Sequence, residues 1–337
     1  MVTLPMEKEI ILREIKRVGL EVEKIRKPNS LVFPMYSDLH CRGIENEATV
    51  NFVECLGELC GNLNPTAVIN MGDNFAMLGR EEHIQNAELF EKFEALLTVV
   101  KDKINCPLLL MNGNHDAIGT DFFKPQFWFN IVNGKYDDGL ANRVEGTGYF
   151  LVDFDDQNTR LVFMSVPSES NLDTEYPTPI WRFGETQLEW LKDVALNTEY
   201  KVLLFSHVPF FYKYTGDMES KLAVWNGEKA ALSYISTLCG WIDDAKEAAE
   251  IVKAKDTVLA CFSGHVHIDF LREKYEVCGE HINHLPCRQV VTRNALGHSR
   301  DGSENVFEMA IDVMVYDPDD NKIEIIRFGD GKDRKVL

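Results

Sequence analysis

The sequence predicts an α/β fold. Short apolar runs rich in β-branched residues alternate along the chain with longer amphipathic stretches, which is typical of strands and helices that take turns in such a fold. Hydrophobic residues make up 45% of the chain and charged residues 26%, as expected for a globular protein with a large core. No repeat or low-complexity segment interrupts the pattern.

The first element is an amphipathic helix over about residues 6–27. Its apolar residues recur at helical spacing, and Pro28, Asn29 and Ser30 then end the pattern. We expect residues 1–30 to pack as a helix on the core and residues 31–337 to form a single domain, although the length of 337 residues also allows two.

Buried strands follow, each read from an apolar run. Between the third and fourth of them, residues 149–166 predict an antiparallel hairpin with its tip at 155–158, and 184–197 predict a helix. Residues 309–328 predict a further hairpin. The buried strands are expected at 31–36, 67–71, 107–111, 201–205 and 257–262.

A side chain able to bind metal comes directly after each buried strand. In α/β sheets, ligand sites form beyond the carboxyl ends of strands, where neighbouring loops meet. We therefore expect these side chains to converge on one site. In chain order they are Asp38 and His40, then Asp73, then Asn114 with His115, then His207, and finally His265 and His267.

The individual motifs differ in how specific they are. Asp38 and His40 point to one face of extended backbone, but such a pair is by itself more often a surface pair than a ligand pair. Asp73 follows a glycine and has two oxygens to bridge two cations, or it caps the strand as an Asx turn. His207 alone is more often a satisfied core histidine.

Two motifs carry more weight. The run 113–116, Gly-Asn-His-Asp, joins a flexible glycine, a neutral oxygen ligand, an imidazole and a carboxylate that can orient it. His265 and His267 repeat the alternating geometry with two imidazoles. The occurrence of every motif after a strand, in this order, favours a metal site over structural turns.

Taken together, the motifs D-x-H, G-D, G-N-H-D, H and G-H-x-H resemble the ordered set of calcineurin-like metallophosphoesterases over about residues 31–270. The chain departs from many members at Ala76, where they carry a second acidic residue. The resemblance implies that Asp38, His40 and His267 hold one ion, that Asn114, His207 and His265 hold the other, and that Asp73 bridges them. Mixed nitrogen and oxygen ligands suit manganese, iron or zinc.

The resemblance also implies an architecture: a four-layer sandwich of two mixed β-sheets flanked by helices, with the metals at one edge. We expect the hairpin at 309–328 to extend the second sheet.

The expected reaction is hydrolysis of a phosphomonoester or phosphodiester by hydroxide held between two divalent or trivalent ions. His115, next to the ligand Asn114, is the expected general acid, and Asp116 is expected to hold it in the right tautomer. A helix N-cap is the alternative role for Asp116 and is compatible with the first. Asn114 and Arg42 are the candidate substrate contacts, although an exposed arginine without a role is the better interpretation of Arg42.

The net charge of −19, without a basic cluster, argues against nucleic acid and anionic membranes as partners, and leaves a small phosphorylated substrate. An acidic N-terminus without a signal-like apolar stretch and scattered cysteines indicate the cytoplasm. The sequence makes no prediction of the oligomeric state. The competing hypothesis is a catalytically silent scaffold of this fold that binds a protein partner.

One further motif stands apart. Cys278, His281, His284 and Cys287 are each three residues apart and would suit an additional zinc ion. The spacing does not match paired C-x-x-C sites, so a strand and loop with incidental polar residues is the preferred interpretation.

Overall fold

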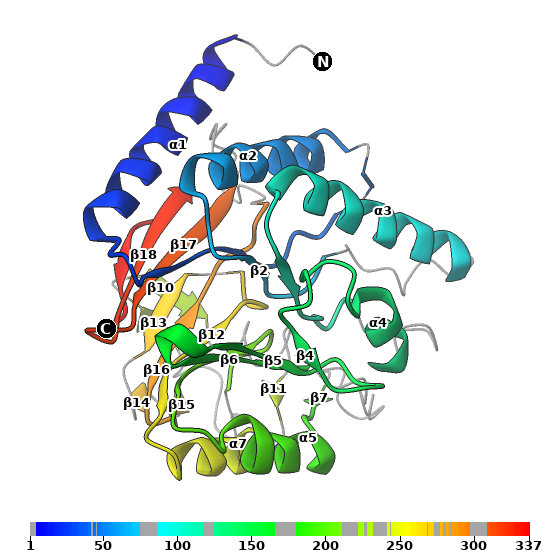
Figure 1. Ribbon diagram of the computed structural model, residues 1–337, viewed down its shortest axis with the longest axis vertical. Helices are drawn as coiled ribbons and strands as arrows, with labels where there is room; N and C mark the ends of the chain where they lie inside the picture. The colour runs from blue at the N-terminus through cyan, green and yellow to red at the C-terminus, as the bar shows by residue number, and fades with distance from the viewer. Residues whose placement is uncertain are drawn as a thin grey trace.

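The computed structural model describes residues 5–41, 43–44, 46–74, 86–116, 125–165, 180–210, 222–225, 228–231, 241–242, 244–267, 269–272, 277–278, 281–282, 285–296 and 309–337. These residues form four layers, as predicted (Figure 1). Helices α1 (Pro5–Ile25), α2 (Glu47–Leu63) and α3 (Asn86–Ile104) cover a first sheet, and α5 (Glu185–Trp190) and α7 (Ala245–Lys253) cover a second. Helix α4 (Pro125–Val132) lies to one side.

The first sheet has six strands in the order β19-β18-β17-β1-β2-β3. The parallel strands β1 (Leu31–Tyr36), β2 (Val68–Asn70) and β3 (Leu108–Leu110) lie where the sequence predicts them. They continue into the antiparallel strands β17 (Ala310–Asp317), β18 (Lys322–Gly329) and β19 (Arg334–Lys335).

The C-terminal hairpin corrects one expectation. It was expected to extend the second sheet, but β17 pairs with β1 of the first sheet, from Leu31↔Tyr316 to Met35↔Asp312. Strand β17 is buried along its whole length, because one face meets the helices and the other meets the second sheet. A strand buried on both faces belongs in a sheet interior, and β17 is central in the first sheet.

The second sheet has seven strands in the order β13-β16-β12-β8-β6-β5-β4. Strands β6 (Thr159–Met164), β8 (Lys201–Ser206), β12 (Val258–Ser263) and β16 (Arg288–Val291) are parallel. Strand β5 (Phe150–Phe154) forms the predicted hairpin with β6. Strands β4 (Asn142–Arg143) and β13 (Phe270–Arg272) complete the edges.

Among the described residues, three short strand pairs lie outside the two sheets. They are β7 (Ile180–Trp181) with β11 (Trp241–Ile242), β9 (Leu222–Trp225) with β10 (Glu228–Ala231), and β14 (Val277–Cys278) with β15 (His281–Ile282).

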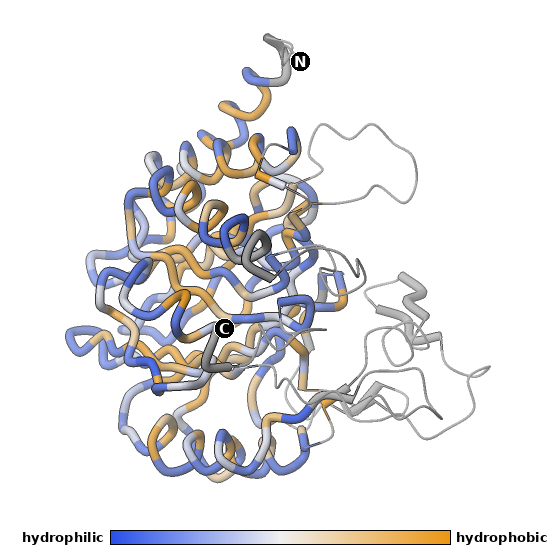
Figure 2. Tube along the Cα trace, turned by 90° about the vertical axis from the view of Figure 1, so that its right-hand side faces the viewer, coloured by the Kyte–Doolittle hydropathy of each residue, from blue (hydrophilic) through white to orange (hydrophobic). Residues whose placement is uncertain are grey.

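Alternation along the strands explains the layers. In β1, Phe33 and Met35 face the second sheet, whereas Val32 and Tyr36 face the helices. Between the sheets, stacked phenylalanines run across neighbouring strands with ring centroids 4.3–5.0 Å apart: Phe150, Phe163, Phe205 and Phe262. Figure 2 shows hydrophobic residues concentrated along the central strands.

Helix α1 packs on this body by one face. Ile15, Val18 and Val22 are buried in the cluster that α2 shares, while Leu12 and Leu20 are exposed. Within the described part of the chain, none of the helices combines the length and apolar character needed to cross a membrane.

Candidate metal centre

The predicted ligands follow five strands that belong to both sheets. Strands β1, β2 and β3 of the first sheet lead to Asp38 and His40, to Asp73 and to Asn114. Strands β8 and β12 of the second sheet lead to His207 and to His265 and His267. All these strands are parallel to a neighbour, so their carboxyl ends meet at one edge of the sandwich.

One group of donors is formed by Asp38, His40 and His267, whose ligand atoms all lie within 4.8 Å of one another. The Nε2 atom of His267 is 3.2 Å from Oδ1 of Asp38, and that of His40 is 3.8 Å from the same oxygen. The two Nε2 atoms are themselves 2.9 Å apart. We refer to these residues as the first triad.

A second group is formed by Asp73, His207 and His265, again within 4.8 Å. The Nε2 atom of His207 lies 3.2 Å from Oδ2 of Asp73 and 3.0 Å from Oδ1 of Asn114, which adds the amide oxygen to the group. Oδ2 of Asp73 is also 4.0 Å from Nε2 of His40 in the first triad. Asp73 therefore stands between the groups, as a bridging ligand would.

The backbone at these residues is unusual. Asp38, His40 and Asp73 have φ angles of 54°, 45° and 55°, and His265 and His267 have φ angles of 70° and 57°. Residues other than glycine rarely adopt this left-handed region, and where they do the surrounding structure compensates the cost. Such strain is common at functional sites, which supports a function for this edge.

Hydrogen bonds between loops fix those conformations. The N–H of Asp38 donates to the Gly72 carbonyl at 2.9 Å, and the N–H of His40 donates to the Asp73 carbonyl at 3.1 Å. Across the two sheets, the N–H of His265 donates to Oδ2 of Asp38 at 2.9 Å. The loops therefore hold one another, and the ligand positions depend on all of them.

The glycines of the motifs allow close approach of these loops. Gly72 has a φ angle of 95°, and a Cβ atom there would lie 2.5 Å from the Gly113 nitrogen. A Cβ atom at Gly113 would lie 2.0 Å from Oδ1 of Asp73. Both distances are too short for any side chain, so the Asp73 and Asn114 loops can meet only as glycine-containing loops.

The donor set fits metal ions. Oδ1 of Asp38 and Oδ2 of Asp73 are buried and accept no hydrogen bond in normal geometry within the described residues. Nδ1 of His207 is 2.7 Å from the Met71 carbonyl, which only accepts, so Nδ1 carries the proton. In the neutral ring, Nε2 of His207 is then an acceptor. It faces two more acceptors, Oδ2 of Asp73 and Oδ1 of Asn114, and a cation would satisfy all three.

The pKa shifts of His207 and Asp38 show that the carboxylates at this edge attract positive charge, whereas burial lowers the pKa of His40. Burial disfavours the charged form of His207, but the Asp73 and Asp38 carboxylates outweigh it and raise the His207 pKa to about 9. Burial likewise opposes ionisation of Asp38, yet His267 and His207 hold its pKa well below the usual range. Protons thus compensate the carboxylates in the position that cations would take.

His115 lies at the rim of this centre. Its N–H donates to Oδ1 of Asp73 at 2.7 Å, and its Nε2 is 3.8 Å from Oδ2 of Asp73. Its side chain is 19% exposed. His40, Asp73 and His115 also lie close enough to share an ion, so geometry alone allows His115 to be a ligand as well as an acid.

Asp116 has other partners than expected. Its Oδ2 accepts the N–H groups of Asp73 and Gly113, both at 2.9 Å, and its Oδ1 accepts the N–H of Asn74 at 3.0 Å. The His115 imidazole is not among its partners within the described residues. Asp116 therefore joins the two ligand loops through their backbone N–H groups, and none of its hydrogen bonds within the described residues goes to the His115 ring.

The residues that would test two further expectations, about Asp116 and Arg42, lie outside the described part of the chain. The residues directly after Asp116, where a helix would begin, are not described, so the N-cap alternative stays a prediction. Arg42 is not described either.

Sequence reasoning missed the polar groups that support the ligands. Asn74 hydrogen-bonds to Asn70 and to Asp116, and the Ser165 hydroxyl donates to Oδ1 of Asn112 at 2.9 Å. A polar residue inside an otherwise apolar strand, such as Asn70, was a usable signal. The Met71 carbonyl left none, because every residue has one.

The described residues do not test the additional zinc site, and incidental polar residues stay the preferred interpretation. Cys278 and His281 are paired across β14 and β15, His284 lies outside the described residues, and Cys287 is buried. Burial raises the pKa of Cys287 to about 12, which disfavours the thiolate that binds metal.

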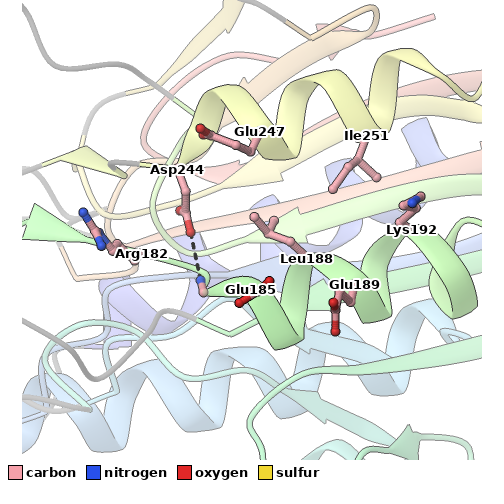
Figure 3. A pocket seen from close by; sticks show the side chains of 9 residues that line it. Arg182, Glu185, Leu188, Glu189, Lys192, Asp244, Glu247 and Ile251 are labelled. Atoms are coloured by element: carbon pink, nitrogen blue, oxygen red, sulfur yellow. Dashed lines mark hydrogen bonds between the residues drawn. The ribbon is translucent and has the colours of Figure 1, made fainter.

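A surface groove of about 490 Å³ lies elsewhere, between α5 and α7 (Figure 3). Leu188 and Ile251 lie between charged side chains there, and the Asp244 carboxylate accepts the N–H groups of Phe183 and Gly184 at 2.9 and 2.8 Å. None of the predicted ligands lines it. The groove is therefore separate from the predicted metal centre.

Comparison with known proteins agrees with the fold and the motifs. Among solved structures, the chain is similar to a dimetal phosphatase from Danio rerio, with a TM-score of 0.53 and 13% identity over 91% of this chain and 98% of that one. It is also similar to PhoD, with a TM-score of 0.52 and 10% identity over 91% and 72% of the two chains. No curated protein matches it in sequence. The family model for calcineurin-like phosphoesterase matches residues 35–269, more than half of the chain, and the chain therefore belongs to the calcineurin-like phosphoesterase family.

Proposed function

We propose that this protein is a dinuclear metal-dependent phosphoesterase that hydrolyses a small phosphomonoester or phosphodiester. The observation that carries the proposal is the pair of buried carboxylate oxygens, Oδ1 of Asp38 and Oδ2 of Asp73, which accept no hydrogen bond in the described structure and are surrounded by imidazole nitrogens. A buried charge is retained only where a partner compensates it, and two cations provide that compensation.

Each of the two donor groups would hold one ion. The first triad, Asp38, His40 and His267, would hold one ion. His207, His265 and Asn114 would hold the other, and Asp73 would contact both. Manganese, iron and zinc suit these donors. When bound, such ions act as Lewis acids on the phosphoryl oxygens and lower the pKa of water.

The remaining chemistry falls to the protein's own side chains. The Nε2 atom of His115 faces the centre from a partly exposed position, so it can reach the leaving oxygen of a bound ester and donate a proton to it. Its ring packs edge-on against His40 with centroids 4.6 Å apart, and its backbone is fixed by the bond to Asp73. The side chain is thus held at the rim. Asn114 and Arg42 are proposed to contact the substrate.

The net charge supports the substrate class. A protein with a formal charge of −19 repels nucleic-acid backbones, whereas bound cations reverse the field locally for a small phosphate. A silent scaffold has no need of a complete donor set, so the retained ligands favour the enzyme. The cytoplasmic compartment stays a prediction from the sequence.

The test is hydrolysis of p-nitrophenyl phosphate and of bis(p-nitrophenyl) phosphate by purified protein with added Mn²⁺. We expect turnover of at least one ester by the wild type and its loss in Asp73→Asn. Asp156→Asn makes the same charge change on the exposed tip of the β5–β6 hairpin and should keep full activity. Metal binding without turnover of either ester would favour the scaffold hypothesis.

A second experiment tests the role of His115. General acid catalysis is worth about 10²–10⁴-fold, and only for leaving groups too basic to depart unaided. His115→Ala should therefore slow an alkyl phosphoester far more than a p-nitrophenyl ester at unchanged metal content. Equal slowing of both esters would mean that His115 positions the phosphate or binds an ion.

A further inference from the structure

A cluster of charged residues, two of them fully buried, lies next to the loop that carries His265 and His267. It consists of Asp269, which is two residues after His267, and of Asp312, Arg327 and Arg334 from the C-terminal strands. We call these residues the clamp. The side chains of Asp312 and Arg327 are 0% and 1% exposed, and that of Arg334 is 12% exposed. Such residues are seldom buried unless their charges are paired, and here each carboxylate meets both guanidinium groups.

The contacts within the clamp are specific. Nε of Arg327 is 2.9 Å from Oδ1 of Asp312, an ion pair without hydrogen-bond alignment, and Arg334 pairs with Oδ2 of Asp312. Oδ1 of Asp269 accepts a hydrogen bond from Arg327 at 2.5 Å and lies 3.6 Å from Arg334. The backbone N–H of Arg293 also donates to Asp269, at 3.1 Å.

The clamp joins the two sheets beside the first triad. Asp312 in β17 is paired in register with Met35 of β1, three residues before Asp38. Asp269 belongs to the segment that leaves β12 of the second sheet, just after His267. The clamp thus ties the strand that ends at Asp38 to the loop that presents His267.

Nearby backbone bonds reinforce the same connection. The N–H of Ala295 donates to the Ser37 carbonyl at 2.7 Å, and the N–H of Thr292 donates to the Ser263 carbonyl at 2.8 Å. The Thr292 hydroxyl donates to Oδ2 of Asp312, also at 2.7 Å. Two of the other ligands have different supports, since His207 is held by the Met71 carbonyl and Asp73 by Asp116.

We propose that Arg334, Arg327 and Asp312 are positioning residues that set the separation of Asp38 and His40 from His267, and thereby the affinity of the first triad for its ion. The inference rests on the proposed function only in assuming that the ligand groups bind ions. Removal of a group that holds a metal ligand in place typically changes metal affinity by about 10–100-fold. The family model ends at residue 269, so three of the clamp residues lie beyond the matched range.

The test is a titration of the whole 337-residue chain with Mn²⁺, in which binding is measured by calorimetry and by electron paramagnetic resonance. In Arg334→Gln we expect one of two binding steps to weaken by about 10–100-fold while the other is unchanged. The weakened step should be the one that His40→Ala abolishes. Arg334→Lys keeps the charge and should recover part of the loss.

Arg160→Gln is the matched control. The Arg160 side chain is 14% exposed, pairs with Asp153 at 2.6 Å and donates to backbone carbonyls, as Arg334 does, but it lies on the β5–β6 hairpin. Both binding steps should stay at wild-type affinity in this variant.

Several outcomes overturn the proposal. Wild-type affinity at both steps in Arg334→Gln would do so, and so would an equal loss at both, because the clamp would then be general scaffolding. If Arg334→Gln does not fold, Asp269→Asn, at a 23% exposed side chain, carries the same expectation. A wild type that binds two ions but hydrolyses no ester would remove the proposed function and leave this inference intact, whereas a wild type that binds no ion would refute both.

Discussion

The substitution Asp116→Asn separates two roles for a residue next to the general acid candidate. If the Asp116 carboxylate oriented His115, the asparagine variant would fold normally and lose acid catalysis. The structure instead gives that carboxylate three backbone N–H donors, from Asp73, Asn74 and Gly113. The variant should therefore be destabilised, and the ligand loops should lose their geometry.

The magnitude follows from those hydrogen bonds. The amide oxygen can replace only one carboxylate oxygen, and the arrangement that keeps the donors of Asp73 and Gly113 turns the NH₂ group toward the Asn74 N–H. One buried donor left without an acceptor costs about 1–3 kcal/mol. The other two bonds become neutral, and each weakens by about 1 kcal/mol. The total is about 3–5 kcal/mol.

Urea unfolding followed by circular dichroism measures this loss, and elemental analysis measures bound metal. Asp244→Asn is the control, because Asp244 also accepts two backbone N–H groups but lies in the groove between α5 and α7. It should lose stability and keep its metal. An Asp116→Asn variant with wild-type stability and metal content, slowed only toward alkyl esters, would refute the loop-organising role.

Three further predictions concern the core, the glycines and pH. Phe205→Ala, which removes a fully buried ring stacked on Phe163 and Phe262, should cost about 3–5 kcal/mol in urea unfolding, and a loss below 1 kcal/mol would contradict the stacked core. Gly264→Ala should abolish metal binding because its Cβ would lie 1.8 Å from the Ser37 hydroxyl oxygen, whereas Gly61→Ala, which meets nothing within 4 Å in helix α2, should be neutral or stabilising by about 1 kcal/mol. Burial opposes ionisation of Asp312, but Arg327 and Arg334 lower its pKa below 3.8, so its contribution to stability is present above that pH and is lost as the pH falls through the lower folded value. Stability measured from pH 6 to pH 3 should fall less steeply in Asp312→Asn than in the wild type, and an unchanged slope would count against the ion pairs.

The sequence predicted the strands that lead to the site because their signal is local. An apolar run such as that of β1, ended by a polar ligand, reports a buried strand and its carboxyl end without reference to the rest of the chain. Convergence of the ligands then followed from the general rule for parallel strands. The predicted boundaries agree with the structure to within a residue or two.

What the sequence could not predict depends on long-range pairing. The position of β17 beside β1 joins residues about 280 apart, and apolar alternation fits either sheet. The partners of Asp116 were missed because a carboxylate beside a histidine suggests a pair, while backbone donors from the Asp73 loop exist only after folding. The clamp was missed for the same reason, since Asp269 and Arg327 are distant in the chain.

The central claim is that two ions share Asp73, and metal content measured by mass spectrometry on the folded wild type and Asp73→Asn tests it most directly. The account predicts two ions per wild-type chain after incubation with Mn²⁺ and removal of free metal, and loss of tightly bound metal from Asp73→Asn with its circular dichroism spectrum unchanged. A wild type that retains no metal, or an Asp73→Asn variant that keeps both ions, would contradict it.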